Sequence, residues 1–546
     1  MSADPLRRRS IRTAKAVGLG VALCLYVSVA ARAEDNVSPK SKAYKADYID
    51  VMLKEAWDES SVKPSPLASD AEFQRRLYLD LLGRIPNVKE AEAFLSGKDL
   101  GKRVKEIDYV LESPDFAKNM GNAWTVLLIG RKRQERNVDR KALNDWIRQQ
   151  FAADRPWNEI ARELITAKGS NKTNGAVNYT MAHLEFGAVP LTSITTRVFL
   201  GQQIQCTQCH DHPSIDEWKQ ADFWGINAFF KGIKTRDVLK ADATGAEVYD
   251  HTELFDQPTA EYSRYDRRDG TIRIVFPTFL GNKKISQSAD VNRREKLGDF
   301  ITASDNDQFP RAFVNRLWGH MMGKGFVNPV DDFGPHNQPS LPDLLDKLTS
   351  DFKASGYNAK SLARWIANCK AYQLSSVTTK ENEKDDSLFS HMLLKPMNPE
   401  QLFDSLLTAT SAHKVGGGGG MDRQRDAWLG KFIFTFSTDE GEESSSFQGT
   451  IPQALMMMNG ELMDKAVGGK QGSFLADALE QAQLQRRQPI DVVLTNRLYL
   501  ASLSRYPSKT EATEARHFLQ SAPDKIQVME DLFWALLNSN EFILNH

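Results

Sequence analysis

The stretch FQRRLYLDLLGRIP, residues 73–86, decides how this chain folds. Its apolar side chains recur at helical spacing, at Phe73, Leu77, Leu81 and Leu82. This spacing places them on one face and predicts an amphipathic helix that packs on a core. Gly83 and Pro86 end the helix, because glycine favours the C-terminal cap and proline cannot continue a helix.

Helical spacing continues on both sides of this stretch. One helix is expected near residues 43–57, and more amphipathic segments cover 89–96, 103–111, 115–130, 139–152, 157–168 and 192–203. The tripeptide Asp154-Arg155-Pro156 predicts a break between two of them. The aromatic-rich run 223–230 predicts a buried helix. The first half of the chain is therefore expected to be helical.

The pattern changes near Thr235. Residues 246–280 alternate between polar and apolar, as in the run 271–276, and this period is typical of strands. Helical spacing resumes at about residue 289. We therefore predict a small β-rich linker or insertion over residues 235–288.

Start and stop signals divide the rest of the chain into helices. Ser340 looks like an N-cap before an apolar stripe that Gly356 ends, and Asn398-Pro399 is a second start signal. The run 529–546 predicts a further apolar helix. Two loops are expected, Gly416–Gly420, which lacks a phosphate-loop lysine, and the acidic Asp439–Ser446.

The N-terminus has the pattern of an export signal. Basic residues come first, at Arg7, Arg8, Arg9, Arg12 and Lys15. An apolar run over 17–30 and the small-x-small site Ala31-Arg32-Ala33 follow. We predict a signal peptide over 1–33 and a polar lead-in over 34–66. An uncleaved anchor stays open, as does the choice between the general and the twin-arginine export routes, and no later segment is expected to span a membrane.

Composition predicts a large globular protein that does not bind nucleic acid. Cleavage after residue 33 removes six basic side chains and Asp4, which takes the formal net charge from −1 to −6. Cys206, Cys209 and Cys369 are the cysteines that remain, too few for a disulfide scaffold. Cys369 lies at an apolar helical position and is expected to be a buried thiol. The oligomeric state stays open.

The motif Cys206-Thr207-Gln208-Cys209-His210 carries the clearest chemistry. Two thiols at this spacing, followed by histidine, are the attachment signature of covalent haem c. Each thiol adds to one vinyl group, and His210 is expected to bind the haem iron. Two alternatives stay open: a Zn²⁺ site that uses the thiolates with His212, and a disulfide or redox dithiol.

A sixth haem ligand cannot be chosen from the sequence. The candidates are Met181, His183, His320, Met321, Met322 and the run Met456–Met458. A methionine would raise the reduction potential and a histidine would lower it. A methionine at helical spacing is typical of a core, so none of these residues is assigned as a ligand.

Asp331 and Asp332 form a second candidate cluster. With Asn315, Arg316 and His336 they could make a hydrolytic or cation site. A structural ion pair between Arg316 and an aspartate is the other interpretation.

Several runs together resemble a two-domain family from planctomycetes, a cytochrome-c-like domain (DUF1549) followed by a planctomycete-specific domain (DUF1553). The first domain is matched by 73–86, 155–157, 163–167, 199–213 and 228–230. The second is matched by 311–318, 323–327, 331–334, 372–373, 452–455, 459 and 538–546. The resemblance covers nearly the whole mature chain and implies haem only through the motif already described.

Together these features predict a mainly α, multi-helical two-domain protein with a small β-rich insertion between the domains. A cytochrome-c-like helical domain is expected over 67–234 and a second helical domain over 289–546. The leading hypothesis is an exported c-type haem protein, periplasmic or at the cell surface, that exchanges electrons with a redox partner protein. The alternatives are a non-enzymatic binding module stapled by zinc or a disulfide, and an exported hydrolase whose site lies in the second domain.

Overall fold

The computed structural model describes residues 47–546 except 132–135, 214, 260, 289, 416–420, 437–452, 454–455, 459 and 485–487. The predicted signal peptide, residues 34–46 of the lead-in and the two predicted loops at 416–420 and 439–446 lie outside the described residues. Contacts divide the chain into residues 1–47 and one compact unit over 48–546. The described part of the chain has no helix long and apolar enough to cross a membrane.

Helix α3 (Asp70–Leu82) is the helix predicted at residues 73–82. The Ser69 side chain accepts a hydrogen bond from the Glu72 backbone N–H at its start. Gly83 ends it in the left-handed region, with φ 70°, and its N–H binds the Leu79 carbonyl. The expected one-sided burial was wrong, because Arg75, Arg76 and Asp80 on the polar face are also buried.

The buried arginines of α3 bind carbonyl groups from distant parts of the chain. Arg75 donates to the carbonyl oxygens of Ser502 at 3.0 Å and Phe542 at 2.7 Å. Arg76 donates to the Leu374 carbonyl at 2.9 Å. These carbonyls lie where helices end and lack a partner within the helix. Burial of the charged face is therefore a consequence of tertiary contacts, and not of the pattern within α3.

The helices that follow α3 agree with the sequence pattern to within a few residues. They are α4 (Val88–Ser96), α5 (Lys102–Glu112), α6 (Pro114–Ile129), α7 (Arg140–Ala152) and α8 (Trp157–Thr166), after the earlier α2 (Asp47–Glu59). The short helix α9 (Val177–Met181) was not predicted. Helix α10 (Glu185–Leu200) is interrupted by a left-handed turn over 186–188, so its regular part begins three residues before the expected residue 192. Helix α11 (Gln220–Asn227) and a 3₁₀ turn (Ala228–Phe230) form the aromatic segment.

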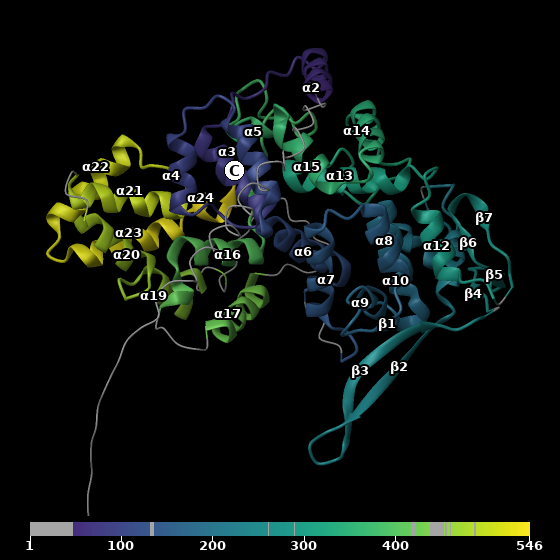
Figure 1. The fold of residues 1–546 in the computed structure, drawn as a ribbon. Helices are drawn as coiled ribbons and strands as arrows, with labels where there is room; N and C mark the ends of the chain where they lie inside the picture. The colour runs from purple at the N-terminus through teal and green to yellow at the C-terminus, as the bar shows by residue number, and fades with distance from the viewer. Residues whose placement is uncertain are drawn as a thin grey trace, which may run out of the picture. The chain divides into compact units, whose positions relative to one another are not determined.

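The β-rich part follows α11. Strands β2 (Ile233–Ala241) and β3 (Glu247–Asp256) form a long antiparallel hairpin, and β1 (Gly169–Ser170) pairs with β3 (Figure 1). Two smaller hairpins are β4 (Ser263–Asp266) with β5 (Ile272–Val275), and β6 (Thr278–Phe279) with β7 (Lys283–Lys284). The predicted fold class, mainly α with a small β-rich part, is confirmed. The domain boundaries stay predictions.

Helices resume with α12 (Arg293–Ile301), α13 (Gln308–Met322), α14 (Pro342–Ala354) and α15 (Ala359–Asn368). The predicted N-cap Ser340 was wrong, since Leu341 holds that position without a side-chain hydrogen bond. The Ser340 N–H instead binds the Phe326 carbonyl at 2.9 Å. Cys369 is buried as predicted, and burial raises the pKa of its thiol to about 12.

The C-terminal helices are α16 (Pro399–Thr410), α17 (Met421–Phe436), α19 (Glu461–Val467), α20 (Phe474–Leu484), α21 (Ile490–Leu503), α22 (Lys509–Ser521), α23 (Lys525–Leu537) and α24 (Asn540–Ile543). A capping box at Asn398 starts α16, as the sequence predicted. The single helix expected over 529–546 is wrong. The Ser539 side chain caps a new helix there, and β9 (Leu544–Asn545) then pairs with β8 (Lys395–Pro396).

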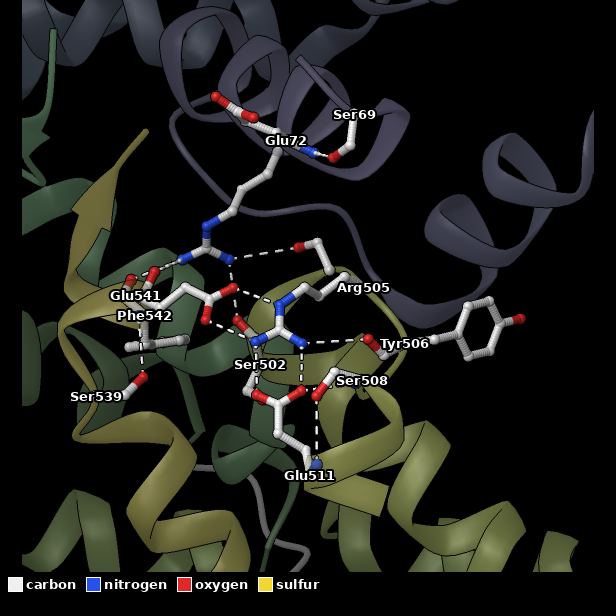
Figure 2. Close-up of polar contacts among 12 residues, drawn as sticks. Ser69, Glu72, Ser502, Arg505, Tyr506, Ser508, Glu511, Ser539, Glu541 and Phe542 are labelled. Carbon is white, nitrogen blue, oxygen red and sulfur yellow. Dashed lines mark hydrogen bonds and ion pairs between the residues drawn. The ribbon is translucent and has the colours of Figure 1, made fainter. Parts of the chain in front are cut away.

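Residues far apart in sequence share one core. Leu79, Ile85 and Val88 pack in the same cluster as residues of α16, α21 and α23. Helix α4 contacts α21 (Figure 1), and α3 contacts β9. Nearby, Arg505 pairs with both Glu511 and Glu541 and ties α22 to α24 (Figure 2). The first and last parts of the compact unit are therefore held together by this shared core and by the hydrogen bonds of Arg75.

Candidate functional site

The cysteine motif lies on a 3₁₀ turn, Ile204–Gln208, that ends at Cys209. Side chains three residues apart eclipse one another in a 3₁₀ helix, so Ile204 and Thr207 share one face and Cys206 and Cys209 share another. Ile204 and Thr207 are buried, whereas both cysteines are exposed free thiols. The local fold therefore presents two sulfurs on the same outward face.

Hydrogen bonds from α11 hold the backbone of the turn. Trp224 Nε1 and Gln220 Nε2 donate to the Gln208 carbonyl at 3.0 and 3.2 Å. The Thr207 hydroxyl donates to the Ile204 carbonyl at 2.7 Å. These hydrogen bonds fix the backbone that carries Cys206 and Cys209, so the two Cα–Cβ bonds keep the same relative orientation.

His210 adopts the tautomer that suits metal ligation. Its Nδ1 lies 2.6 Å from the Asp211 carbonyl oxygen. A carbonyl oxygen only accepts hydrogen bonds, so Nδ1 carries the proton and Nε2 carries the lone pair of the neutral ring. A backbone carbonyl on one ring nitrogen, with a metal on the other, is the usual arrangement of a ligating histidine.

His212 lies in a small group of rings beside the motif. Its ring centroid is 5.4 Å from that of Trp218 and 6.3 Å from that of His336. Burial, His336 and His210 lower its pKa, so His212 is neutral at pH 7. His336 Nε2 lies 3.1 Å from Asp332 Oδ1. Sequence reasoning missed the pairing of His212 with His336, because no local pattern links two loops so far apart.

The residues present fit covalent haem. That group requires two accessible thiols on one face and one imidazole nitrogen with a lone pair, and the motif supplies all three. A zinc ion requires about four ligands. Within the described ranges, no three His, Cys, Asp or Glu side chains are grouped so that they could hold a metal ion. The thiols with His212 are therefore not assembled as a zinc site in this arrangement.

The candidate sixth ligands are mostly core residues. Met181, Met321, Met322 and Met457 are buried, Met456 packs against the core, and Met458 is partly exposed. His183 Nε2 binds the Leu128 carbonyl and His320 Nε2 binds the Asp80 carbonyl. His320 also lines a cavity that reaches Gln205, next to Cys206. One candidate sixth ligand, His320, therefore lines the same cavity as Gln205, the residue that precedes the motif.

Asp331 and Asp332, the two aspartates of the second candidate cluster, bind different partners. Asp331 is buried and accepts from Arg197 Nε at 2.6 Å and Gln203 Nε2 at 2.9 Å. Arg316 lies 3.7 Å from the same carboxylate. Burial would raise the pKa of Asp331, but the two arginines outweigh it and lower the pKa. Asp332 faces His336 instead, so the carboxylates do not act as a pair.

The nearby Asn315 is structural. Its side-chain amide donates to the carbonyls of Val327 and Val330 and accepts from the Val327 N–H. These bonds fix the loop that carries Asp331. The Arg316–Asp331 ion pair considered from the sequence is present, and sequence reasoning missed the closer partner Arg197.

We expect the protein to lose stability as the pH falls from 7 to 5. Burial lowers the pKa of His320, so the folded state keeps this ring neutral while the unfolded chain binds a proton near pH 6.5. The unfolded state then holds more protons, and the free energy of unfolding falls by up to about 1.4 kcal/mol per pH unit for one such group. His212, His391, His413 and His546 shift in the same direction.

The measurement is the urea midpoint at pH 7, 6 and 5. His320→Gln keeps a donor for the Asp80 carbonyl but cannot titrate, so its midpoint should depend less on pH than that of the wild type. The exposed His517 is the control, and His517→Gln should follow the wild type. Parallel curves for all three proteins would contradict the assignment.

Two family models match the chain, in the order that the motifs predicted. Residues 48–235 match PSCyt2, a protein of unknown function (DUF1549), and residues 293–445 match PSD1, a protein of unknown function (DUF1553). Searches of the curated proteins and of the solved structures found no match.

Proposed function

Because this chain belongs to the proteins that carry a PSCyt2 domain followed by a PSD1 domain, whose descriptions state no activity, we propose from its own residues that it is an exported c-type haem protein that transfers electrons. The observation that supports this proposal most is the outward face of the 3₁₀ turn, which carries Cys206 and Cys209 together.

The chain contributes these two thiols to the attachment reaction. Each S–H adds across one vinyl C=C, forming a C–S bond and a C–H bond, so no oxidant is consumed. Cys206 and Cys209 would hold the group, and Nε2 of His210 would face the iron. The group supplies one-electron redox chemistry when bound. The chain supplies the tether, the tautomer of His210 and the fixed backbone of the turn.

The N-terminal pattern supports export, which haem attachment of this kind requires. The basic run, the apolar run and Ala31-Arg32-Ala33 are the three parts of a secretory signal. Exposed free thiols are also what an attachment system outside the cytoplasm would act on. Electron exchange with a redox partner protein would then take place at the exposed face of the motif.

The test is production of the full chain in a bacterial host with a cytochrome c maturation system. We expect a sharp reduced α-band and haem that stays on the protein in a denaturing gel. Replacing both Cys206 and Cys209 with serine should abolish the covalent pigment. His210→Ala should keep some attached haem but change its spectrum, because the ligand to the iron is lost.

The control is Cys369→Ala, which removes a buried thiol away from the motif and should leave the pigment unchanged. Colourless wild-type protein, in a host that matures another c-type cytochrome, would overturn the proposal. Colourless protein with one zinc per chain would favour the zinc-stapled binding module. Pigment retained in the double serine variant would show that attachment does not use this motif.

A further inference from the structure

A large cavity borders the cysteine motif. Its volume is about 1300 Å³, and its walls come from α6, α10, α13, the loop at Gln203–Gln205 and residues 386–398. Ligand pockets in proteins commonly measure roughly 300–1,000 Å³. The cavity is therefore large enough for an organic ligand, and neither Cys206 nor Cys209 of the proposed haem site lines it.

Positive charge exceeds negative charge on the described lining. The cationic side chains are Arg131, Arg197, Arg316, Lys324 and Lys395, and the acidic ones are Asp331 and Asp386. Three of the cations already pair with a carboxylate other than Asp331, and Lys324 pairs with Asp386 at 3.1 Å. Lys395 donates to Asp80 and to two backbone carbonyls, and Arg131 makes a forked pair with Glu400.

Arg197 is the cation best placed to meet a ligand. Its Nε binds Asp331 at 2.6 Å, while its side chain stays 34% exposed. Arg197 lines the cavity, and the bond from Nε uses only one of the five N–H donors of this guanidinium. Arg316 lies 3.7 Å from the same carboxylate, so one ionised aspartate faces two guanidinium groups. This stretch of wall attracts anions.

Apolar side chains form much of the remaining wall. They are Met120, Trp124 and Leu127 from α6, and Phe313 and Leu317 from α13. A cavity that combines an apolar wall with a few convergent polar groups is typical of a site for an organic ligand. A charge-assisted hydrogen bond from arginine is stronger than one between neutral groups.

We propose that this cavity binds an organic oxyanion, with its carboxylate, sulfate or phosphate group on Arg197 and Arg316 and its apolar body against α6 and α13. The inference does not rest on haem. It depends only on the residues that line the cavity. Protein without haem would therefore not contradict it.

The test uses the full chain and the fluorescent aromatic sulfonate 1-anilinonaphthalene-8-sulfonate. We expect one saturable site, and Arg197→Gln should weaken binding about tenfold because one charged donor is lost. Asp331→Asn should tighten binding severalfold, since it removes the negative charge that competes with the ligand. This opposite direction separates a charge effect from general damage to the fold.

Arg162→Gln is the matched control. Arg162 makes an ion pair with Asp299, is 44% exposed and does not line the cavity, so its loss should leave the affinity unchanged. The neutral probe N-phenyl-1-naphthylamine lacks the sulfonate and should bind Arg197→Gln and the wild type alike. Far-ultraviolet circular dichroism checks that each variant is folded.

Displacement by 1-naphthoate, 1-naphthalenesulfonate and 1-naphthyl phosphate ranks the three oxyanions on one ring, with 1-naphthalenemethanol as the neutral member. At least one anion should displace the probe well below the concentration that the alcohol needs. Binding that Arg197→Gln leaves within twofold of the wild type would overturn the proposal. Equal displacement by all four naphthalenes would do so too.

Discussion

Replacing Asp80 with alanine should lower the free energy of unfolding by about 3–5 kcal/mol, the cost expected when one partner of a buried ion pair is removed. Asp80 is almost fully buried, and its carboxylate accepts from Lys395 Nζ at 2.6 Å, Asn545 Nδ2 at 2.7 Å and the Tyr372 hydroxyl at 2.8 Å. The substitution would leave the Lys395 ammonium largely buried without its counter-charge. Urea unfolding followed by tryptophan fluorescence measures the change.

Two further variants identify the cause. Asp80→Asn keeps the shape and one acceptor oxygen, so it should cost less than alanine. The Asp80→Ala/Lys395→Met double variant should be more stable than the sum of the single variants predicts, because it leaves neither charge unpaired. Additive losses would show that Asp80 acts through packing and hydrogen bonds alone.

Replacing Arg75 with methionine should also cost about 3–5 kcal/mol, because buried carbonyl oxygens lose their donors. Arg75 binds the carbonyls of Ser502, Glu541 and Phe542 and lies 3.4 Å from the Ser504 hydroxyl. Burial lowers its pKa to about 10, so the guanidinium is still charged at neutral pH. Methionine fills similar space but donates no hydrogen bond.

The loss should appear at the C-terminal end of the chain first. Limited proteolysis should cut Arg75→Met near α24 at protease concentrations that leave the wild type intact. Arg155→Met is the control, since Arg155 pairs with Glu159 and Glu163 at the surface and should contribute less than about 1 kcal/mol. If both variants lose the same stability, Arg75 does not tie the ends of the compact unit together.

Local signals in the sequence predicted individual elements well. Helix α3 ends at Gly83, and α16 begins with the Asn398 capping box, because caps involve residues only a few positions apart. Local signals failed to predict helix boundaries where another segment of the chain binds the same backbone. Ser340 looked like an N-cap, but Leu341 holds that position, and the Ser340 N–H binds the carbonyl of Phe326 from the preceding loop. The last predicted helix is broken by a cap at Ser539 and by the pairing of β9 with β8.

The sequence likewise predicted some features of the candidate site and missed others. The spacing of Cys206 and Cys209 predicted that both thiols attach to one group, and the 3₁₀ turn places them on one face. Nothing in the sequence joined His212 to His336, or Asp331 to Arg197, because each pair links loops or helices that meet only in the folded chain. The cavity beside the motif has no sequence signature at all, since its walls come from many separate segments.

By itself the sequence determined that residues 73–82 form a helix, that the chain is mainly helical with a small β-rich part, and that two thiols and an imidazole lie next to one another. These properties follow from hydrogen bonds and side-chain spacing within a few residues. Only the tertiary structure decided that Arg75, Arg76 and Asp80 are buried. A charged side chain leaves water only where distant carbonyls and counter-charges replace its hydration, and those partners come together only when the whole compact unit folds.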